Sequence, residues 1–127
     1  MKEVTRRKPS LVVIKLYEGQ LLNSFIVITP LGHKVLVNED AITRLVDKHP
    51  ELRGHEDLVI RALRDPDEIY RDKSGGFHCL KKIHAVSDYI VVIYVTKNNK
   101  GYIKTGYFTS IRRKLRRYRW LERVFSK

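Results

Sequence analysis

The chain has 127 residues, of which 43% are hydrophobic, so it is long enough for one domain with a single core and too apolar for a disordered protein. Lys and Arg number 26 and Asp and Glu 14, which gives a formal net charge of +12. An excess of this size favours a polyanionic partner, either nucleic acid or anionic lipid.

Two further features of the composition narrow the class of protein. No apolar run approaches the roughly 20 residues that a membrane span needs, and the charged N-terminus does not resemble a signal peptide. Cys79 is the only cysteine, which excludes an intramolecular disulfide and argues against a zinc site built on thiolates. We therefore expect a cytoplasmic protein without a membrane-spanning segment.

The first half of the chain predicts short strands followed by two helices. Residues 1–10 are expected to form a flexible basic arm, and residues 11–127 a single α+β domain. β-branched runs predict strands at residues 11–16, 25–28 and 34–37. Asn38 is a good N-cap for a helix that ends near His49, because Pro50 disfavours helical conformation in the residue before it. A second helix is predicted from Glu56 to Arg64.

The second half predicts an antiparallel β-meander of about four strands and a basic C-terminal helix. The strands are expected at residues 68–72, 77–84, 89–95 and 102–109, with hairpin loops at 74–76 and 98–101. Ile111, Leu115, Tyr118, Leu121 and Phe125 recur at helical spacing, so we expect this apolar stripe, Leu115 included, to dock in the core. The arginines would then occupy the opposite, exposed face.

No nucleotide-binding or metal-binding motif is visible, and no cofactor is expected. What remains is a set of histidines, hydroxyl groups and cations. These are the groups that promote attack of an RNA 2′-hydroxyl on its own phosphate, which needs a base, an acid and a positive charge.

The order of several short motifs resembles the barnase–EndoU–colicin–RelE superfamily of small metal-independent ribonucleases, in its phage-type branch. The most suggestive motifs are His49-Pro-Glu-Leu52 and Lys104-Thr-Gly-Tyr-Phe-Thr109. Gly106 stands where a small residue such as alanine is more usual in this pattern. The resemblance also draws on five further segments, which are residues 34–37, 60–63, 65–69, 70–73 and 91–94.

The resemblance implies active-site roles for a small set of residues, each of which also has a purely structural reading. His49 could cap the end of its helix, Arg71 and Lys73 could be solvated charges on one strand face, and a strand tyrosine is common in a core. Thr105 and Tyr107 share a face of their strand by alternation. The implied catalytic residues are His49, Arg71, Lys73, Thr105 and Tyr107.

The sequence thus predicts a metal-independent endoribonuclease of toxin-like type, with RNA as its partner and an antitoxin or immunity protein as a possible second one. The alternative is an RNA-binding module without catalysis, in which tyrosines stack on unpaired bases. Attachment of the C-terminal helix to a membrane surface is a third, less favoured reading. The predicted RNA-binding residues are Lys104, Arg112, Arg113, Arg116, Arg117, Arg119 and Arg123.

Overall fold

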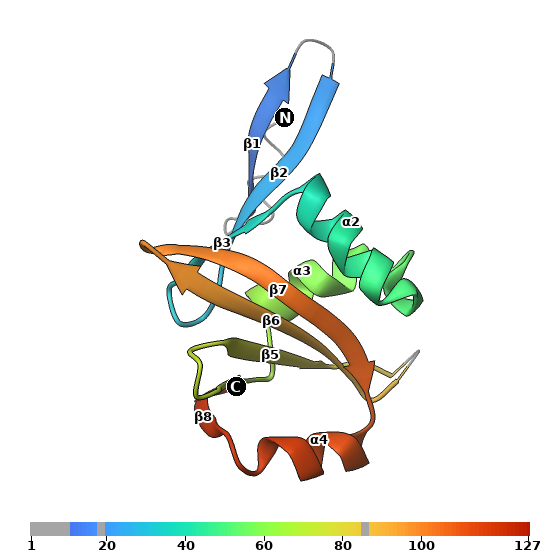
Figure 1. Cartoon of the computed structure of the whole chain (residues 1–127), viewed down its shortest axis with the longest axis vertical. Coiled ribbons are helices and arrows are strands. Elements are labelled where there is room, and N and C mark those ends of the chain that lie inside the picture. Colours follow the sequence, from blue (N-terminus) through green and yellow to red (C-terminus); the bar gives the residue numbers. More distant parts are fainter. Residues whose placement is uncertain (1–10, 18–19, 85–86) are drawn as a thin grey trace.

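The computed structural model describes residues 11–17, 20–84 and 87–127, which form an α+β fold (Figure 1). The predicted basic arm at residues 1–10 lies outside the described residues. Within the described ranges, no helix is both long enough and apolar enough to cross a bilayer.

Eight strands of the described chain form one mixed sheet in the order β1-β2-β3-β7-β6-β5-β4-β8. The strands are β1 (Leu11–Tyr17), β2 (Gln20–Ile28), β3 (Lys34–Val37), β4 (Glu68–Arg71), β5 (Phe77–Lys82), β6 (Tyr89–Lys97), β7 (Lys100–Thr109) and β8 (Glu122–Ser126). The helices are α2 (Glu39–Lys48), the 3₁₀ turn η1 (Pro50–Leu52), α3 (Glu56–Arg64) and α4 (Ile111–Tyr118).

The sheet is larger than the predicted four-strand meander. Strands β4 to β7 are antiparallel neighbours, but β3 joins β7 in parallel and β8 joins β4 in antiparallel orientation. The hairpin between β6 and β7 turns through Asn98 and Asn99, whose φ angles of 52° and 66° are the left-handed values that a two-residue turn requires.

A glycine lets β3 lie against β7. A Cβ atom at Gly101 would stand 2.8 Å from Val35 Cγ2 and 3.1 Å from the Lys34 carbonyl oxygen. Any larger residue would push β3 away from β7, because neither the strand backbone nor the buried Val35 has room to move.

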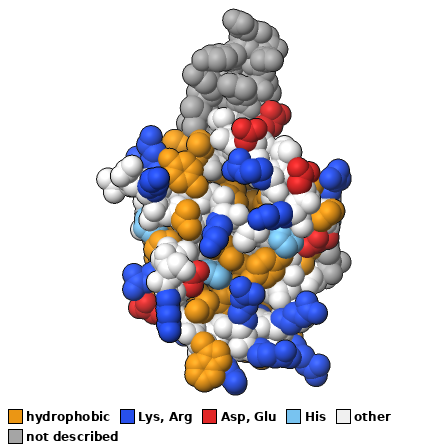
Figure 2. Space-filling view, in the orientation of Figure 1, with side chains coloured by type: hydrophobic (Ala, Val, Ile, Leu, Met, Phe, Trp, Pro, Cys, Tyr) orange, Lys and Arg blue, Asp and Glu red, His pale blue; other side chains and the backbone are white. Residues whose placement is uncertain are grey.

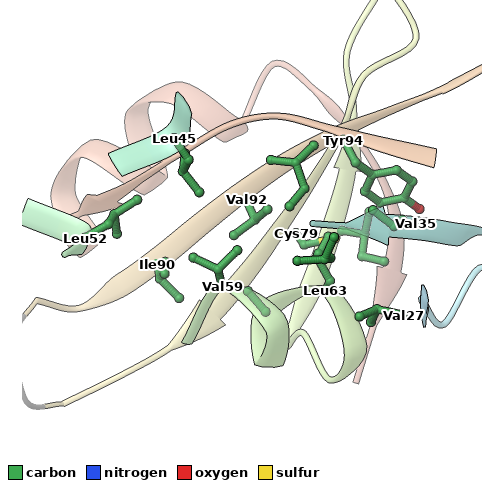
Figure 3. Packing of buried hydrophobic residues seen from close by; sticks show 14 of the residues in the cluster. Val27, Val35, Leu45, Leu52, Val59, Leu63, Cys79, Ile90, Val92 and Tyr94 are labelled. Atoms are coloured by element: carbon green, nitrogen blue, oxygen red, sulfur yellow. The ribbon is translucent and has the colours of Figure 1, made fainter. Parts of the chain in front are cut away.

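The main core lies on the face of the sheet that α2 and α3 cover. Leu45 of α2 and Leu63 of α3 pack with Val92 of β6 and Tyr94 of the same strand, and all four side chains are buried (Figure 3). Helices α2 and α3 form as predicted, and the Asn38 side chain accepts a hydrogen bond from the Ala41 amide at 2.8 Å at the start of α2.

A smaller core lies on the opposite face, beneath α4. Tyr118 of α4 packs there against Tyr70, with ring centroids 4.9 Å apart, and Leu80 and Val91 complete the buried layer. The central strands are therefore covered on both faces, which explains why β6 is apolar along most of its length.

The predicted C-terminal helix is wrong in its length and in the face it buries. Helix α4 ends at Tyr118, and Arg123 and Phe125 belong to β8, where Phe125 pairs with Ile69. Leu115, expected in the core, is 59% exposed. The apolar spacing is misleading here because β4 needs a strand neighbour on its outer edge, and residues 122–126 supply it.

An ion pair, together with the buried Tyr118, anchors α4. Lys114 is buried, and its Nζ lies 2.9 Å from Oε1 of Glu68 on β4. The same ammonium group lies over the rings of Tyr70 and Tyr89, with its Nζ 5.9 and 5.5 Å from their centroids. Burial alone lowers the pKa of Lys114, but Glu68 outweighs this and raises it above its ordinary value.

Candidate active site

A cleft of about 720 Å³ opens at the edge of the sheet where β7 ends, and it contains three of the five predicted catalytic residues. These are His49, Thr105 and Tyr107. We define the cleft by all its lining residues, which are His49, Thr105, Tyr107, Phe108, Thr109, Arg113, Arg116 and Arg117.

The sheet topology creates the cleft. Strand β3 pairs with β7 only at Gly101 and Tyr102, so one side of residues 103–109 has no neighbouring strand in the described chain. Helix α2 and η1 lie over one face of the sheet and α4 over the other (Figure 1). The cleft takes residues from both layers and thus straddles the open edge of β7.

The alternation of β7 directs its polar side chains as the sequence predicted. Thr105 lies opposite Ile93 and Tyr107 opposite Val91, so both side chains project on the α4 face. Gly106, between them, faces α2: a Cβ atom there would lie 3.0 Å from the Val91 carbonyl oxygen and 3.4 Å from a Leu45 methyl group. The glycine therefore allows α2 to approach this strand closely.

His49 reaches the cleft from the end of α2. Its backbone amide donates to the Leu45 carbonyl at 2.9 Å and fixes the residue as the C-cap of the helix. The imidazole lies with its centroid 6.0 Å from that of the Tyr107 ring, and Nδ1 is 3.3 Å from a Glu51 carboxylate oxygen. That contact orients the ring and leaves Nε2 available.

Three arginines of α4 form the cationic wall of the cleft. Arg113, Arg116 and Arg117 recur at helical spacing and share one side of α4. The guanidinium carbon of Arg117 lies 5.6 Å from the centroid of the Tyr107 ring. The Ser110 hydroxyl caps the helix by accepting from the Arg113 amide at 3.2 Å, which secures the first turn.

A second, smaller cavity continues the basic surface past Thr105. It has a volume of about 210 Å³ and is lined in part by Arg44 and Lys48 of α2 and by Lys104 of β7. Lys104 is the extra residue of a β-bulge between the pairs Ile93–Thr105 and Tyr94–Ile103. Lys and Arg side chains gather over α4 and continue upward along this face (Figure 2).

The structure does not bring Arg71 and Lys73 into the cleft. Both line a separate cavity of about 420 Å³, together with Trp120 and Glu122. Arg71 ends β4 and is paired with Glu122 at 3.0 Å, while Lys73 lies in the turn after that strand and not on its face. The structure therefore places them apart from His49, in a different cavity.

The remaining predicted RNA-binding arginines also lie outside the cleft lining. Arg119 follows α4, with its guanidinium carbon 5.0 Å from the centroid of the exposed Trp120 ring. Arg112 is exposed on α4, and Arg123 is exposed on β8. They add to the positive charge of this end of the molecule without lining the cleft.

The cleft is connected to a buried chain of hydrogen bonds that the sequence did not reveal. Tyr107 Oη lies 3.0 Å from Tyr118 Oη, which lies 2.8 Å from His78 Nδ1. The other ring nitrogen, Nε2, lies 2.7 Å from a carboxylate oxygen of Asp72. His78 and Tyr118 are only 3% and 2% exposed, so these partners replace water for both side chains.

The protonation states fix the direction of each hydrogen bond in this chain. Burial alone raises the pKa of Asp72, but hydrogen bonds from His78, Gly76 and Ser74 bring it down to about 2, so the carboxylate only accepts. Burial lowers the pKa of His78 below its ordinary 6.5, which favours the neutral ring at pH 7. His78 Nε2–H therefore donates to Asp72, Tyr118 donates to Nδ1, and Tyr107 donates to Tyr118.

His78 could have been suspected from its position in the sequence. It alternates with Leu80 on one face of β5, a setting in which a polar side chain needs a buried partner. The partner, Tyr118, lies 40 residues away on a helix, and no local pattern links the two.

Within the described ranges, no group of three or more His, Cys, Asp or Glu side chains could hold a metal ion. The chain was compared with models of protein families, with curated proteins and with solved structures. None of these comparisons finds a match.

Proposed function

We propose that this protein is a metal-independent endoribonuclease of toxin-like type, which cleaves RNA by attack of a 2′-hydroxyl on the adjacent phosphate. An antitoxin or immunity protein would be its natural inhibitor. The observation that carries the proposal is the meeting of His49, Tyr107 and three arginines in one cleft.

The lining of the cleft suits each part of this chemistry. Tyr107 would take the proton of the 2′-hydroxyl, and His49, in its protonated form, would give a proton to the leaving 5′-oxygen. Arg113, Arg116 and Arg117 would bind the phosphate and stabilise the charge that develops on its oxygens. The products would be a 2′,3′-cyclic phosphate and a 5′-hydroxyl end.

The family resemblance supports the same reading. Its two most suggestive motifs are far apart in the chain, yet they supply His49 on one side of the cleft and Thr105 and Tyr107 on the other. A pair of motifs that matched by chance would have no reason to meet at one concave, cationic surface. We therefore propose that the protein belongs to the phage-type branch of the barnase–EndoU–colicin–RelE superfamily.

The test is a cleavage assay on single-stranded RNA with the purified protein in excess EDTA. We expect cleavage with 2′,3′-cyclic phosphate ends, and no cleavage at a position where the RNA carries a single 2′-deoxynucleotide. Replacing His49 by Asn should lower the rate by about 100-fold or more, the usual contribution of a general acid. His84→Asn is the matched control, because His84 is exposed and lies outside the cleft.

The alternative is an RNA-binding module without catalysis, which the same cationic cleft favours. It predicts retention of RNA with intact product bands in the same assay. Cleavage that requires added magnesium, or cleavage that His49→Asn leaves unchanged, would contradict the proposed mechanism.

A further inference from the structure

The series of hydrogen bonds behind Tyr107 places the polar side chains of His78 and Tyr118 in a layer that, apart from the Lys114–Glu68 ion pair, is largely apolar. His78 and Tyr118 lie among Leu80, Val91 and Tyr70 beneath α4. Apolar residues of similar size would fill this layer without needing partners. These hydrogen bonds are therefore better explained by their effect on Tyr107, which lies at the end of the series that opens into the cleft.

We propose that Asp72, His78 and Tyr118 form a proton relay that makes Tyr107 the base of the cleavage reaction. The inference rests on the proposed function and assigns positioning roles to three residues outside the cleft. Tyr107 is the only member that would touch RNA, and the other three act through it.

The direction of the hydrogen bonds carries the argument. With Asp72 ionised and His78 neutral, every member of the series donates inward, towards Asp72. The proton of Tyr107 is then committed to Tyr118, and the lone pairs of its oxygen remain free to accept. The donor–acceptor distances of 3.0, 2.8 and 2.7 Å all lie within the range over which a proton is transferred directly. A hydroxyl group bound in the cleft can therefore donate to Tyr107 without displacing any bond of the chain.

The transfer can be written with each proton accounted for. The 2′-oxygen bonds to phosphorus and its proton moves to Tyr107 Oη, while the Tyr107 proton moves to Tyr118 and the Tyr118 proton to His78 Nδ1. The bond between phosphorus and the 5′-oxygen breaks, and that oxygen takes the proton of His49. The site is then left with a protonated His78 beside ionised Asp72 and a neutral His49. Exchange with solvent through the cleft restores both histidines.

The surroundings of His78 suit a transient proton acceptor. Burial lowers its pKa most, Asp72 opposes that effect, and the charges of Arg117 and Lys104 lower it further. Burial also raises the pKa of Tyr118, so a phenolate does not accumulate there and the proton passes through to the imidazole. Asp72 then stabilises the imidazolium by direct contact at 2.7 Å.

The variant that isolates the relay is Tyr118→Phe, which keeps the buried ring and removes one hydroxyl. We expect kcat to fall by about 100-fold with KM unchanged, because a general base contributes at least that factor and Tyr118 does not contact RNA. Tyr107→Phe should lose a similar factor. The double variant should be no slower than either single variant, because both changes interrupt the same proton path.

The matched control is Tyr70→Phe, a neighbour of Tyr118 in the same buried layer. Its hydroxyl donates to Glu68 at 2.9 Å and takes no part in the relay. Tyr70→Phe should therefore leave kcat unchanged even if it costs as much stability as Tyr118→Phe. Equal losses of kcat in the two variants, or a Tyr118→Phe protein as fast as the parent, would overturn the relay and leave the ribonuclease proposal standing.

A measurement without RNA separates the two proposals. Nitrogen-15 NMR of the histidine rings should show His78 protonated at Nε2 alone, with an Nδ1 signal that shifts in Tyr118→Phe. A proton on Nδ1 of His78 would reverse the direction of the hydrogen bonds and overturn the relay whether or not RNA is cleaved. A wild-type protein that cleaves no RNA would overturn the proposed function, and with it the role of Tyr107 as a base. The NMR result would then still show in which direction the hydrogen bonds run.

Discussion

At the scale of single residues, the site depends on polar groups that the core must hold without water. Asp72 is the end point of the chain, and its carboxylate accepts from His78 and from the amides of Ser74 and Gly76 at 3.0 and 2.8 Å. One carboxylate therefore orders the β4–β5 turn and sets the proton position on His78. Its removal should affect both stability and the response to pH.

Replacing Asp72 by Asn should lower the free energy of unfolding at pH 7 by about 2 kcal/mol, since the folded state lowers the pKa of Asp72 from 3.8 to about 2. Asp72 also opposes the lowering of the His78 pKa. Without it, the folded protein resists protonation of His78 more strongly, whereas the unfolded chain still binds a proton near pH 6.5. The variant should therefore lose stability more steeply than the parent as the pH falls below 6.5.

Urea unfolding at a series of pH values from 7 to 5 measures this effect. Asp57→Asn is the control, because Asp57 is exposed in the first turn of α3 and makes no contact with His78. It should leave the pH profile unchanged. If the difference in the free energy of unfolding between the parent and Asp72→Asn narrows from pH 7 to 5, Asp72 does not act on the pKa of His78 in this way.

The sequence singled out part of the cleft lining but not the residues behind it. The motifs of the resemblance named His49, Thr105 and Tyr107, and the structure brings these three side chains together in one cleft. Tyr118 and His78 escaped because their contact depends on how α4 docks on the sheet, which no local spacing encodes.

At the scale of elements, α4 docks on the sheet through a buried charged residue, Lys114, as well as through Tyr118. The Lys114→Ala variant should lose about 3 kcal/mol of stability, because it leaves Glu68 largely buried without its partner. Leu115→Ala, at the adjacent exposed position, should change stability by no more than about 0.5 kcal/mol. Chemical denaturation of the two variants would distinguish this arrangement from a helix docked through Leu115, which predicts the opposite order.

The arginine wall of α4 makes a prediction about salt. Changing Arg116 and Arg117 together to Gln should weaken binding of a non-cleavable 2′-O-methyl RNA and flatten its log–log salt dependence by about 0.7 for each phosphate that is no longer neutralised. Arg112→Gln with Arg119→Gln removes the same charge outside the cleft and is the control. Fluorescence anisotropy over a range of salt concentrations gives both slopes. Equal flattening by the two pairs would mean that only net charge matters.

Secondary structure was most predictable where a local signal marks each boundary. Asn38 and Pro50 bracket α2, and the Asn98-Asn99 turn fixes the β6–β7 hairpin. The end of α4 carries no comparable signal, and the apolar positions at 121 and 125 fit a helix as well as a strand. Pairing of β8 with β4 decides between them, and that pairing is a property of the folded sheet.

At the scale of the whole molecule, a single sheet separates two cores, so both should unfold together. Leu63→Ala, in the core beneath α2 and α3, should lower the free energy of unfolding by about 2–5 kcal/mol. The near-ultraviolet circular dichroism signal draws strongly on the tyrosines of the α4 face, and the far-ultraviolet signal reports on the whole fold. The unfolding midpoints followed by the two signals should shift by the same amount. A shift of the midpoint in only one signal would show that α4 and its core unfold independently.

The order of the cleft residues along the chain has a consequence for synthesis. His49 precedes the β4–β7 hairpins and the arginines of α4 follow them, so the two walls come from opposite sides of the meander. Hairpins between consecutive strands form quickly, whereas joining distant segments is slow. A nascent chain on the ribosome thus lacks one whole wall until α4 has left the exit tunnel. Under the proposed function, a nascent chain that still lacks α4 would therefore not cut the messenger being translated.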